Sequence, residues 1–127
     1  MWHNTNMRQI DNKFLVIAAK EALRGEFRYK HGVAIASGKN LISKGCNRSI
    51  GINTTLSRYR VYFSLHAELT AIARLPFGFE DSCTLYSVRD GGGLAKPCSQ
   101  CLAVISKTSI KRIVFSAGDG LYAEIFL

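Results

Sequence analysis

Two short segments of the sequence determine how the rest of the chain is interpreted: His66-Ala67-Glu68 and, further along, Pro97-Cys98-Ser99-Gln100-Cys101. Together they supply one imidazole, two thiols and one carboxylate. Zinc prefers thiolate and imidazole ligands, and a catalytic zinc keeps three protein ligands with a fourth position open to water. His66, Cys98 and Cys101 are therefore candidate zinc ligands, and the carboxylate of Glu68 is left free for another task.

Both segments are expected to begin helices. Cys98 and Cys101 are three residues apart, so a helix places them on the same face. Pro97 is favoured just inside a helix start because it has no N–H to leave unpaired. A helix N-terminus also stabilises negative charge, which favours the thiolate form of cysteine. The pattern predicts helices from His66 to Leu75 and from Cys98 to Lys107.

The other hydrophobic patterns predict an α/β sandwich with a mixed sheet of four or five strands. Asp11 is suited to cap a first helix that runs to about Arg24. A turn at residues 37–40 joins the first two strands, and the third helix connects two parallel strands. The expected strands are Gly32–Ala36, Asn40–Cys46, Thr84–Val88 and Lys111–Phe115, with Leu121–Leu127 either a further strand or a packed tail.

Length and composition indicate one globular domain over residues 1–127, of which residues 1–10 form a loose N-terminal segment. Hydrophobic residues make up 47% of the chain and charged residues 20%, as in ordinary soluble proteins. No apolar run approaches the length of about 18 residues that a membrane span needs. The segment Met1 to Gln9 lacks the apolar core of a secretory signal. We expect a cytoplasmic protein that does not bind membranes.

The two remaining cysteines leave a rival interpretation open. In a chain without a secretory signal, cysteines favour metal binding over a disulfide framework. Cys46 and Cys83 lie among strand-forming residues, where buried free cysteine commonly packs in the core. The rival is a structural zinc site in which Cys46 or Cys83 supplies a fourth ligand. Such a site would leave no bound water and would give Glu68 no task.

The net charge of +8 favours either a polyanionic partner or simple solubility. Residues 47–64 begin with loop-forming residues and continue with a segment in which Arg58 and Arg60 alternate with aromatic residues. Arginine and aromatic side chains provide phosphate contacts and base stacking in nucleic-acid and nucleotide sites. The alternative is a partly buried strand or helix edge whose aromatic residues only pack. Arg58 and Arg60 are the candidate phosphate-binding residues.

The order H-x-E followed by P-C-x-x-C resembles the signature of the cytidine and deoxycytidylate deaminase superfamily, which includes the tRNA-specific adenosine deaminases. The resemblance covers roughly Asp11 to Asp119. It implies a three-layer α/β/α sandwich with zinc ligands at the starts of two adjacent helices, and it implies a homo-oligomer. It also implies that zinc activates a water molecule and that Glu68 moves protons as general acid and base.

Other positions match the family by motif. Gly45-Cys46-Asn47 matches a G-x-N segment whose asparagine contacts the sugar and base of the substrate, although a plain turn asparagine fits the same residues. Val33 and Ala34 lie on the strand that lines the family's base pocket. The backbone carbonyl of Lys96 is placed to accept a hydrogen bond from the substrate amine. Lysine at this position departs from the glutamate often found in adenosine and guanine deaminases.

Three functions are compatible with these residues. The favoured one is deamination of a cytosine nucleotide, with dCMP or cytidine as substrate. The second is deamination of a base in nucleic acid, either tRNA adenosine or cytosine in single-stranded DNA, which the positive charge supports. The third is an inactive zinc-containing module that uses the same cleft to bind nucleic acid. Fold-level kinship does not decide among them, because one scaffold accepts many substrates.

Overall fold

The computed structural model describes residues 3–4, 9–26, 29–53 and 60–127, and it gives the backbone alone for residues 3–4, 49–53 and 60–64. Its strands are β1 (His3–Asn4), β2 (His31–Ser37), β3 (Asn40–Cys46), β4 (Arg48–Asn53), β5 (Arg60–Leu65), β6 (Cys83–Arg89), β7 (Ile110–Gly118) and β8 (Leu121–Phe126). The helices are α1 (Gln9–Ala22), α2 (Ala67–Ala73), the short 3-10 helix η1 (Asp90–Gly92) and α3 (Ser99–Ile105). No helix in these described ranges combines the length and apolar character that crossing a bilayer requires.

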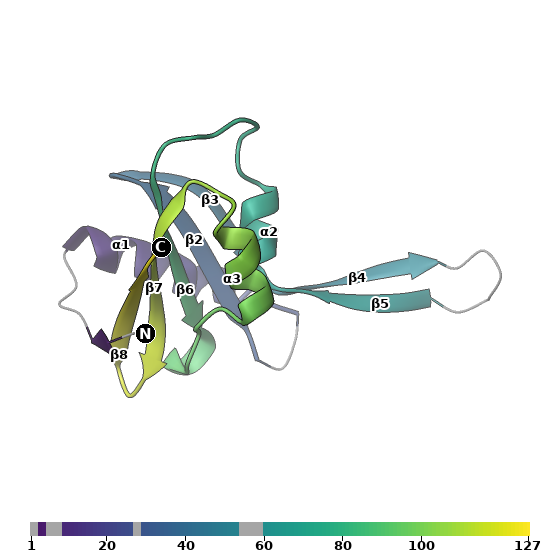
Figure 1. Ribbon diagram of the computed structural model, residues 1–127. Helices are drawn as coiled ribbons and strands as arrows, with labels where there is room; N and C mark the ends of the chain where they lie inside the picture. The colour runs from purple at the N-terminus through teal and green to yellow at the C-terminus, as the bar shows by residue number, and fades with distance from the viewer. Residues whose placement is uncertain (1–2, 5–8, 27–28, 54–59) are drawn as a thin grey trace.

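A mixed sheet in the order β1-β8-β7-β6-β2-β3 forms the centre of the molecule (Figure 1). β6 and β7 are parallel and α3 lies between them in sequence, whereas β2 pairs antiparallel with both β3 and β6. The predicted strand–helix–strand unit and the predicted hairpin are both confirmed. The C-terminal segment is a strand, β8, and the two-residue β1 extends the sheet at its edge.

Helices cover both faces of this sheet, which confirms the predicted three-layer sandwich. Along β2, Val33 and Ile35 pack in a cluster with α2 and α3, whereas Ala34 and Ala36 pack in a second cluster with α1. All four residues are buried. Successive residues of a strand point to opposite faces, so β2 is covered on both sides. This double burial explains why its hydrophobic pattern is nearly continuous.

The structure corrects several element boundaries and one whole segment. α1 begins at Gln9, so Asp11 lies within the first turn and is not the N-cap; α2 and α3 are each seven residues long and end before the predicted limits. The predicted loop after Asn47 is wrong, because Arg48–Asn53 and Arg60–Leu65 pair as an antiparallel hairpin. Glycine and asparagine have low strand propensity, but pairing with a partner strand overrides that preference. Figure 1 shows β4 and β5 extending away from the main sheet.

A buried ionic network joins α1 to the sheet. Asp11 is 1% exposed and accepts hydrogen bonds from Arg112 Nη1 at 2.9 Å and from Tyr86 Oη at 2.6 Å. Arg112 also donates from Nε to Glu124 Oε2 at 2.7 Å. These carboxylates raise the pKa of Arg112, although burial acts in the opposite direction. A buried charge is tolerated when it is paired and hydrogen-bonded in this way.

Two glycines allow helices to approach the sheet closely. A Cβ atom on Gly32 of β2 would lie 2.1 Å from the carbonyl oxygen of Ala18 in α1. A Cβ atom on Gly45 of β3 would lie 2.6 Å from the backbone nitrogen of Ala71 in α2. Neither helix can move aside without breaking its packing on the sheet. The short distances of α1 and α2 from the sheet are therefore possible only because Gly32 and Gly45 have no side chain.

We expect Gly32→Ala to lower the free energy of unfolding by about 3 kcal/mol, because the new methyl group overlaps the backbone of α1. Urea denaturation followed by circular dichroism measures the change. The control is Ser37→Ala, a half-buried position at the end of the same strand, for which a change within about 0.5 kcal/mol is expected. Equal stability of Gly32→Ala and the wild type would contradict the close approach.

Candidate active site

His66, Cys98 and Cys101 converge where α2 and α3 begin. His66 is the N-cap residue of α2 and Cys98 is the N-cap residue of α3. His66 Nδ1 lies 3.2 Å from Cys101 Sγ and 3.8 Å from Cys98 Sγ. The three ligand atoms lie within 4.8 Å of one another. The structure thus brings together the three residues that the sequence singled out as metal ligands.

The geometry of this cluster fits a tetrahedral zinc ion. Zinc binds sulfur at about 2.3 Å and nitrogen at about 2.0 Å, which places neighbouring tetrahedral ligands about 3.5 Å apart. The two nitrogen–sulfur distances bracket that separation. Cys101 is buried, whereas His66 and Cys98 are exposed and line a cavity of about 300 Å³. A fourth coordination position would therefore face the cavity.

The remaining cysteines do not join the cluster. Cys46 and Cys83 are free and buried, and the Cys83 thiol donates to the carbonyl oxygen of Asp81 at 3.2 Å. Among the described residues, the only group of metal-ligating side chains that lies close enough together is the set of three. Cys46 and Cys83 are thus packed in the core, and the described part of the chain offers no fourth thiolate ligand.

The Cys101 thiol requires a metal to become a thiolate. Burial raises the pKa of Cys101, and the negative charge of Glu68 raises it further. The thiol is therefore protonated at neutral pH in the metal-free chain. A metal ion that binds here must displace that proton, which couples metal affinity to pH.

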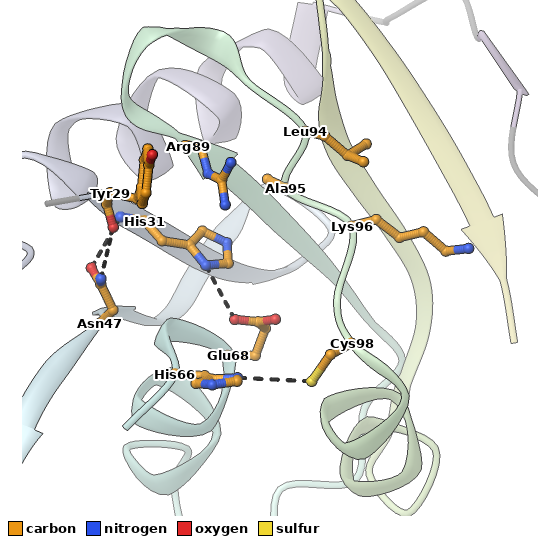
Figure 2. Close-up of a pocket in the computed structure, with 10 residues that line it drawn as sticks. All are labelled: Tyr29, His31, Asn47, His66, Glu68, Arg89, Leu94, Ala95, Lys96 and Cys98. Carbon is orange, nitrogen blue, oxygen red and sulfur yellow. Dashed lines mark hydrogen bonds and ion pairs between the residues drawn. The ribbon is translucent and has the colours of Figure 1, made fainter. Parts of the chain in front are cut away.

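Glu68 lies beside the cluster with one oxygen unsatisfied. It is 2% exposed, and its Oε1 atom forms no hydrogen bond within the described part of the chain. The ring of His31 lies beside it, with Nδ1 at 3.5 Å from Glu68 Oε1. Figure 2 shows both side chains pointing into the same cavity. A buried carboxylate oxygen without a partner is costly to maintain, and it is available to a bound ligand.

Hydrogen bonds fix the orientation of His31. Ser87 Oγ donates its proton to the carbonyl oxygen of Ala95 at 2.8 Å, so it must accept the hydrogen bond that joins it to His31 Nε2 at 2.5 Å. His31 therefore carries a proton on Nε2. In the neutral ring, Nδ1 then presents a lone pair to Glu68 Oε1. At 3.5 Å the two atoms form no hydrogen bond, so Glu68 Oε1 stays available to a molecule in the cavity.

Asn47 connects the cavity to the start of β2. Its Oδ1 atom accepts from the backbone nitrogen of His31 at 3.0 Å, and its Nδ2 atom donates to the carbonyl oxygen of Tyr29 at 2.9 Å. An asparagine side chain has two donors and two acceptor lone pairs. One N–H and one lone pair of Asn47 therefore remain for a molecule in the cavity that Asn47 helps to line.

The other candidate residues from the sequence are distributed unevenly around this cavity. Lys96 lines it, together with Arg89, Leu94 and Ala95 from the same loop. Val33 and Ala34 are fully buried in the two core clusters and do not line it. Arg58 lies outside the described residues, and Arg60 is described only by its backbone in β5.

Five residues that line the cavity belong to no motif in the sequence: Tyr29, His31, Arg89, Leu94 and Ala95. No local pattern identifies them, because they reach the cavity and their partners only through the fold. The contact between His31 and Ser87 spans 56 residues. The run Asp90-Gly91-Gly92-Gly93 was the one available signal, since such glycines commonly mark a specific backbone turn. Gly91 and Gly92 indeed have positive φ values of 83° and 78°.

Comparison with protein families gives a match over residues 8–117 to the model described as the cytidine and deoxycytidylate deaminase zinc-binding region. The matched range contains both motifs and every residue of the candidate site described above. A comparison of the sequence with curated proteins found no significant match.

Solved structures of deaminases share the fold. A cytidine deaminase from Burkholderia pseudomallei is 18% identical, with 94% of this chain and 93% of that chain covered and a TM-score of 0.69. The dCMP deaminase of the cyanophage S-TIM5 in its apo form is 19% identical, with coverage of 90% and 89% and a TM-score of 0.65. The same phage enzyme in complex with dCMP and dUMP is 17% identical, with coverage of 87% and 83% and a TM-score of 0.64. At these identities the similarity establishes the fold.

The surroundings of His31 predict a specific pH dependence of stability. Burial lowers the pKa of His31 from 6.5, Glu68 opposes the shift, and the charges of Arg89 and His66 add to it. The unfolded chain therefore binds this proton at higher pH than the folded chain does, and stability falls as pH falls below 6.5. One such group contributes at most about 1.4 kcal/mol per pH unit.

Replacing His31 with Asn removes this contribution. The quantity to follow is the free energy of unfolding of His31→Asn minus that of the wild type. We expect this difference to become more positive as pH falls from about 7 to about 5, because only the wild type loses the contribution of His31. Urea denaturation at each pH measures it, and taking the difference cancels the effect of the cysteine ligands that both proteins share. A difference that stays constant with pH would contradict the lowered pKa of His31.

Proposed function

Because the chain belongs to the cytidine and deoxycytidylate deaminase family, we propose that it catalyses hydrolytic deamination of a cytosine nucleotide, of the dCMP or cytidine type. Water replaces the exocyclic amine, so the products are the uracil form and ammonia. One observation carries the proposal: the buried carboxylate of Glu68 lies beside the cluster of His66, Cys98 and Cys101 with an oxygen unsatisfied. A purely structural metal site has no use for such an oxygen.

His66, Cys98 and Cys101 would hold zinc, which supplies a water molecule acidic enough to give hydroxide near neutral pH. The residues of the chain do the rest. Glu68 takes up a proton and delivers it to the ring nitrogen beside the carbon under attack, and a further proton leaves with the amine. His31 flanks the Glu68 carboxylate, with its Nδ1 atom 3.5 Å from Glu68 Oε1. Its own orientation is fixed by Ser87.

The substrate is held by groups that line the cavity. We assign to Asn47 the contact with the sugar and base, using the N–H and lone pair that its backbone bonds leave over. The carbonyl oxygen of Lys96 is assigned to the exocyclic amine, which needs an acceptor during the reaction. Val33 and Ala34 are buried in the core, and we assign them no contact with the substrate. The family resemblance suggested these roles, and the position of Asn47 and Lys96 at the cavity supports them.

A nucleic-acid substrate is the second candidate, and two features favour it. The chain carries a net charge of +8, which suits a polyanion. The β4–β5 hairpin also begins directly after Asn47 and ends directly before His66, so both of its ends lie at the cavity. Against it stands the similarity in fold to a phage enzyme solved with dCMP and dUMP. We therefore place the free nucleotide first.

Glu68→Gln tests the assigned chemistry. The amide cannot take up a proton as the carboxylate does, so we expect deamination to fall by at least about a hundredfold. Zinc content, measured by inductively coupled plasma mass spectrometry, should equal that of the wild type because Glu68 is not a ligand. Cys101→Ser is the matched variant that should lose zinc as well. Unchanged activity in Glu68→Gln would refute the role of Glu68.

A substrate panel tests the ranking of the two candidate functions. The zinc-loaded protein is incubated with cytidine, dCMP, a cytosine-containing DNA oligomer and an adenosine-containing RNA hairpin, and ammonia release is measured. We expect conversion of the free cytosine compounds. Conversion of the oligomers alone would reverse the ranking. Binding of the oligomers with no conversion of any compound would identify an inactive binding module instead.

A further inference from the structure

Arg89 is a cation in the cavity, and no carboxylate in the described part of the chain forms an ion pair with it. Its side chain lines the same space as Asn47 and Glu68 (Figure 2). Among the described residues, the ion pairs involve either other arginines or the His31–Glu68 pair, and none of them includes Arg89. Leaving a half-buried guanidinium unpaired costs free energy unless a ligand supplies the negative charge. Nothing in the deamination chemistry described above uses this group.

The structure holds the Arg89 side chain in place. On one side, its guanidinium carbon lies 5.2 Å from the centre of the Tyr29 ring, a distance typical of cation–π contacts. On the other side, a Cβ atom on Gly93 would lie 3.0 Å from Arg89 Cδ, so the glycine leaves room for the side chain. Arg89 thus passes between an aromatic ring and a stretch of bare backbone.

The loop that carries Arg89 is also fixed. The backbone nitrogen of Arg89 donates to Ser116 Oγ at 3.2 Å, and Ser116 Oγ donates to the carbonyl oxygen of Gly93 at 2.5 Å. The backbone nitrogens of Asp90 and Ala95 donate to the carbonyl oxygens of Lys30 and Ser116, each at 2.8 Å. The backbone that carries Arg89 is thus fixed before any ligand arrives, which reduces the entropy lost on binding.

The ligand that binds Arg89 must be an anion, and the other groups that line the cavity indicate which anion it is. Guanidinium groups bind phosphate through two parallel N–H···O bonds. Lys96 also lines the cavity, but its side chain extends away from Arg89 and Asn47 (Figure 2). Asn47, the residue assigned to the sugar, lines the same cavity as Glu68 and Arg89, and it donates a hydrogen bond to the carbonyl oxygen of Tyr29, whose ring contacts Arg89. A phosphate attached to that sugar is therefore an anion that would share the cavity with Arg89.

We propose that Arg89, held by Tyr29 and Gly93, binds the 5′-phosphate of the target nucleotide and makes the protein prefer a nucleotide over the corresponding nucleoside. The inference rests on the proposed deamination and adds the phosphorylation state of the substrate. It moves the phosphate contact from the hairpin, where the sequence suggested Arg58 and Arg60, to the loop between β6 and α3.

The test compares two substrates that differ only in the phosphate. Values of kcat/KM are measured for dCMP and for deoxycytidine with the wild type, Arg89→Met, Arg89→Lys and Lys107→Met. Methionine keeps an unbranched stem without the charge, and lysine keeps the charge without the bidentate fork. Lys107 is an exposed cation that does not line the cavity, so Lys107→Met controls for net charge.

We expect the ratio of kcat/KM for dCMP to that for deoxycytidine to fall roughly 10- to 100-fold in Arg89→Met. The ratio should fall less in Arg89→Lys and stay at the wild-type value in Lys107→Met. A cytosine-containing trinucleotide, added as a third substrate, distinguishes a phosphodiester from a terminal phosphate as the natural source of the anion. An equal loss for dCMP and deoxycytidine in Arg89→Met would overturn the proposal.

A binding measurement keeps this test separate from the proposed function. If none of the compounds is deaminated, the proposed function has failed, and isothermal titration of dUMP and deoxyuridine still decides the role of Arg89. Weaker binding of dUMP to Arg89→Met, with the affinity for deoxyuridine changed far less, supports the phosphate site. Equal affinities of the wild type and Arg89→Met for dUMP overturn it.

Discussion

The convergence of His66, Cys98 and Cys101 depends on two helices beginning side by side on one face of the sheet. α2 and α3 pack against the same hydrophobic cluster, to which β2, β6 and β7 contribute. The parallel pairing of β6 with β7 sends the chain across that face, and α3 is part of the crossover. Two ligands come from one turn of α3 and the third comes from the cap of α2. A change in strand order would separate them, so the metal cluster is a direct product of the sheet topology.

The sequence predicted those features whose causes are local. The ligands were recognisable because Cys98 and Cys101 have helical spacing, although Pro97 lies directly before the N-cap Cys98 and not inside the helix start as predicted. β2 was predicted because Val33 and Ile35 alternate with small residues, as in a strand packed on both faces. The three-layer fold, the family and the strand–helix–strand unit were confirmed. The roles of Glu68, Asn47 and Lys96 remain predictions, and the structure places all three at the cavity.

Features with distant causes could not be predicted in the same way. The β4–β5 hairpin contains Gly51 and Asn53, which disfavour strands locally, and its stability comes from the pairing of one strand with the other. His31 carries no motif, and only its bonds to Ser87 and Glu68 reveal its orientation. Arg89 precedes a glycine run that resembles a flexible linker. The backbone bonds of that loop to Ser116 and Lys30, which hold it in one conformation, involve residues far away in the sequence.

The same residues hold the groups at both ends of the cavity. Ser87 orients His31 and, through its bond to the carbonyl oxygen of Ala95, also holds the loop that runs from Arg89 to Cys98. Ser116 on β7 fixes the same loop from the other side. The positions of the Arg89 guanidinium and the metal ligands are therefore not independent. The distance between the base and the phosphate of a nucleotide is nearly fixed. If Arg89 binds the phosphate and is rigidly connected to the metal ligands, binding of the phosphate also positions the base correctly at the metal site.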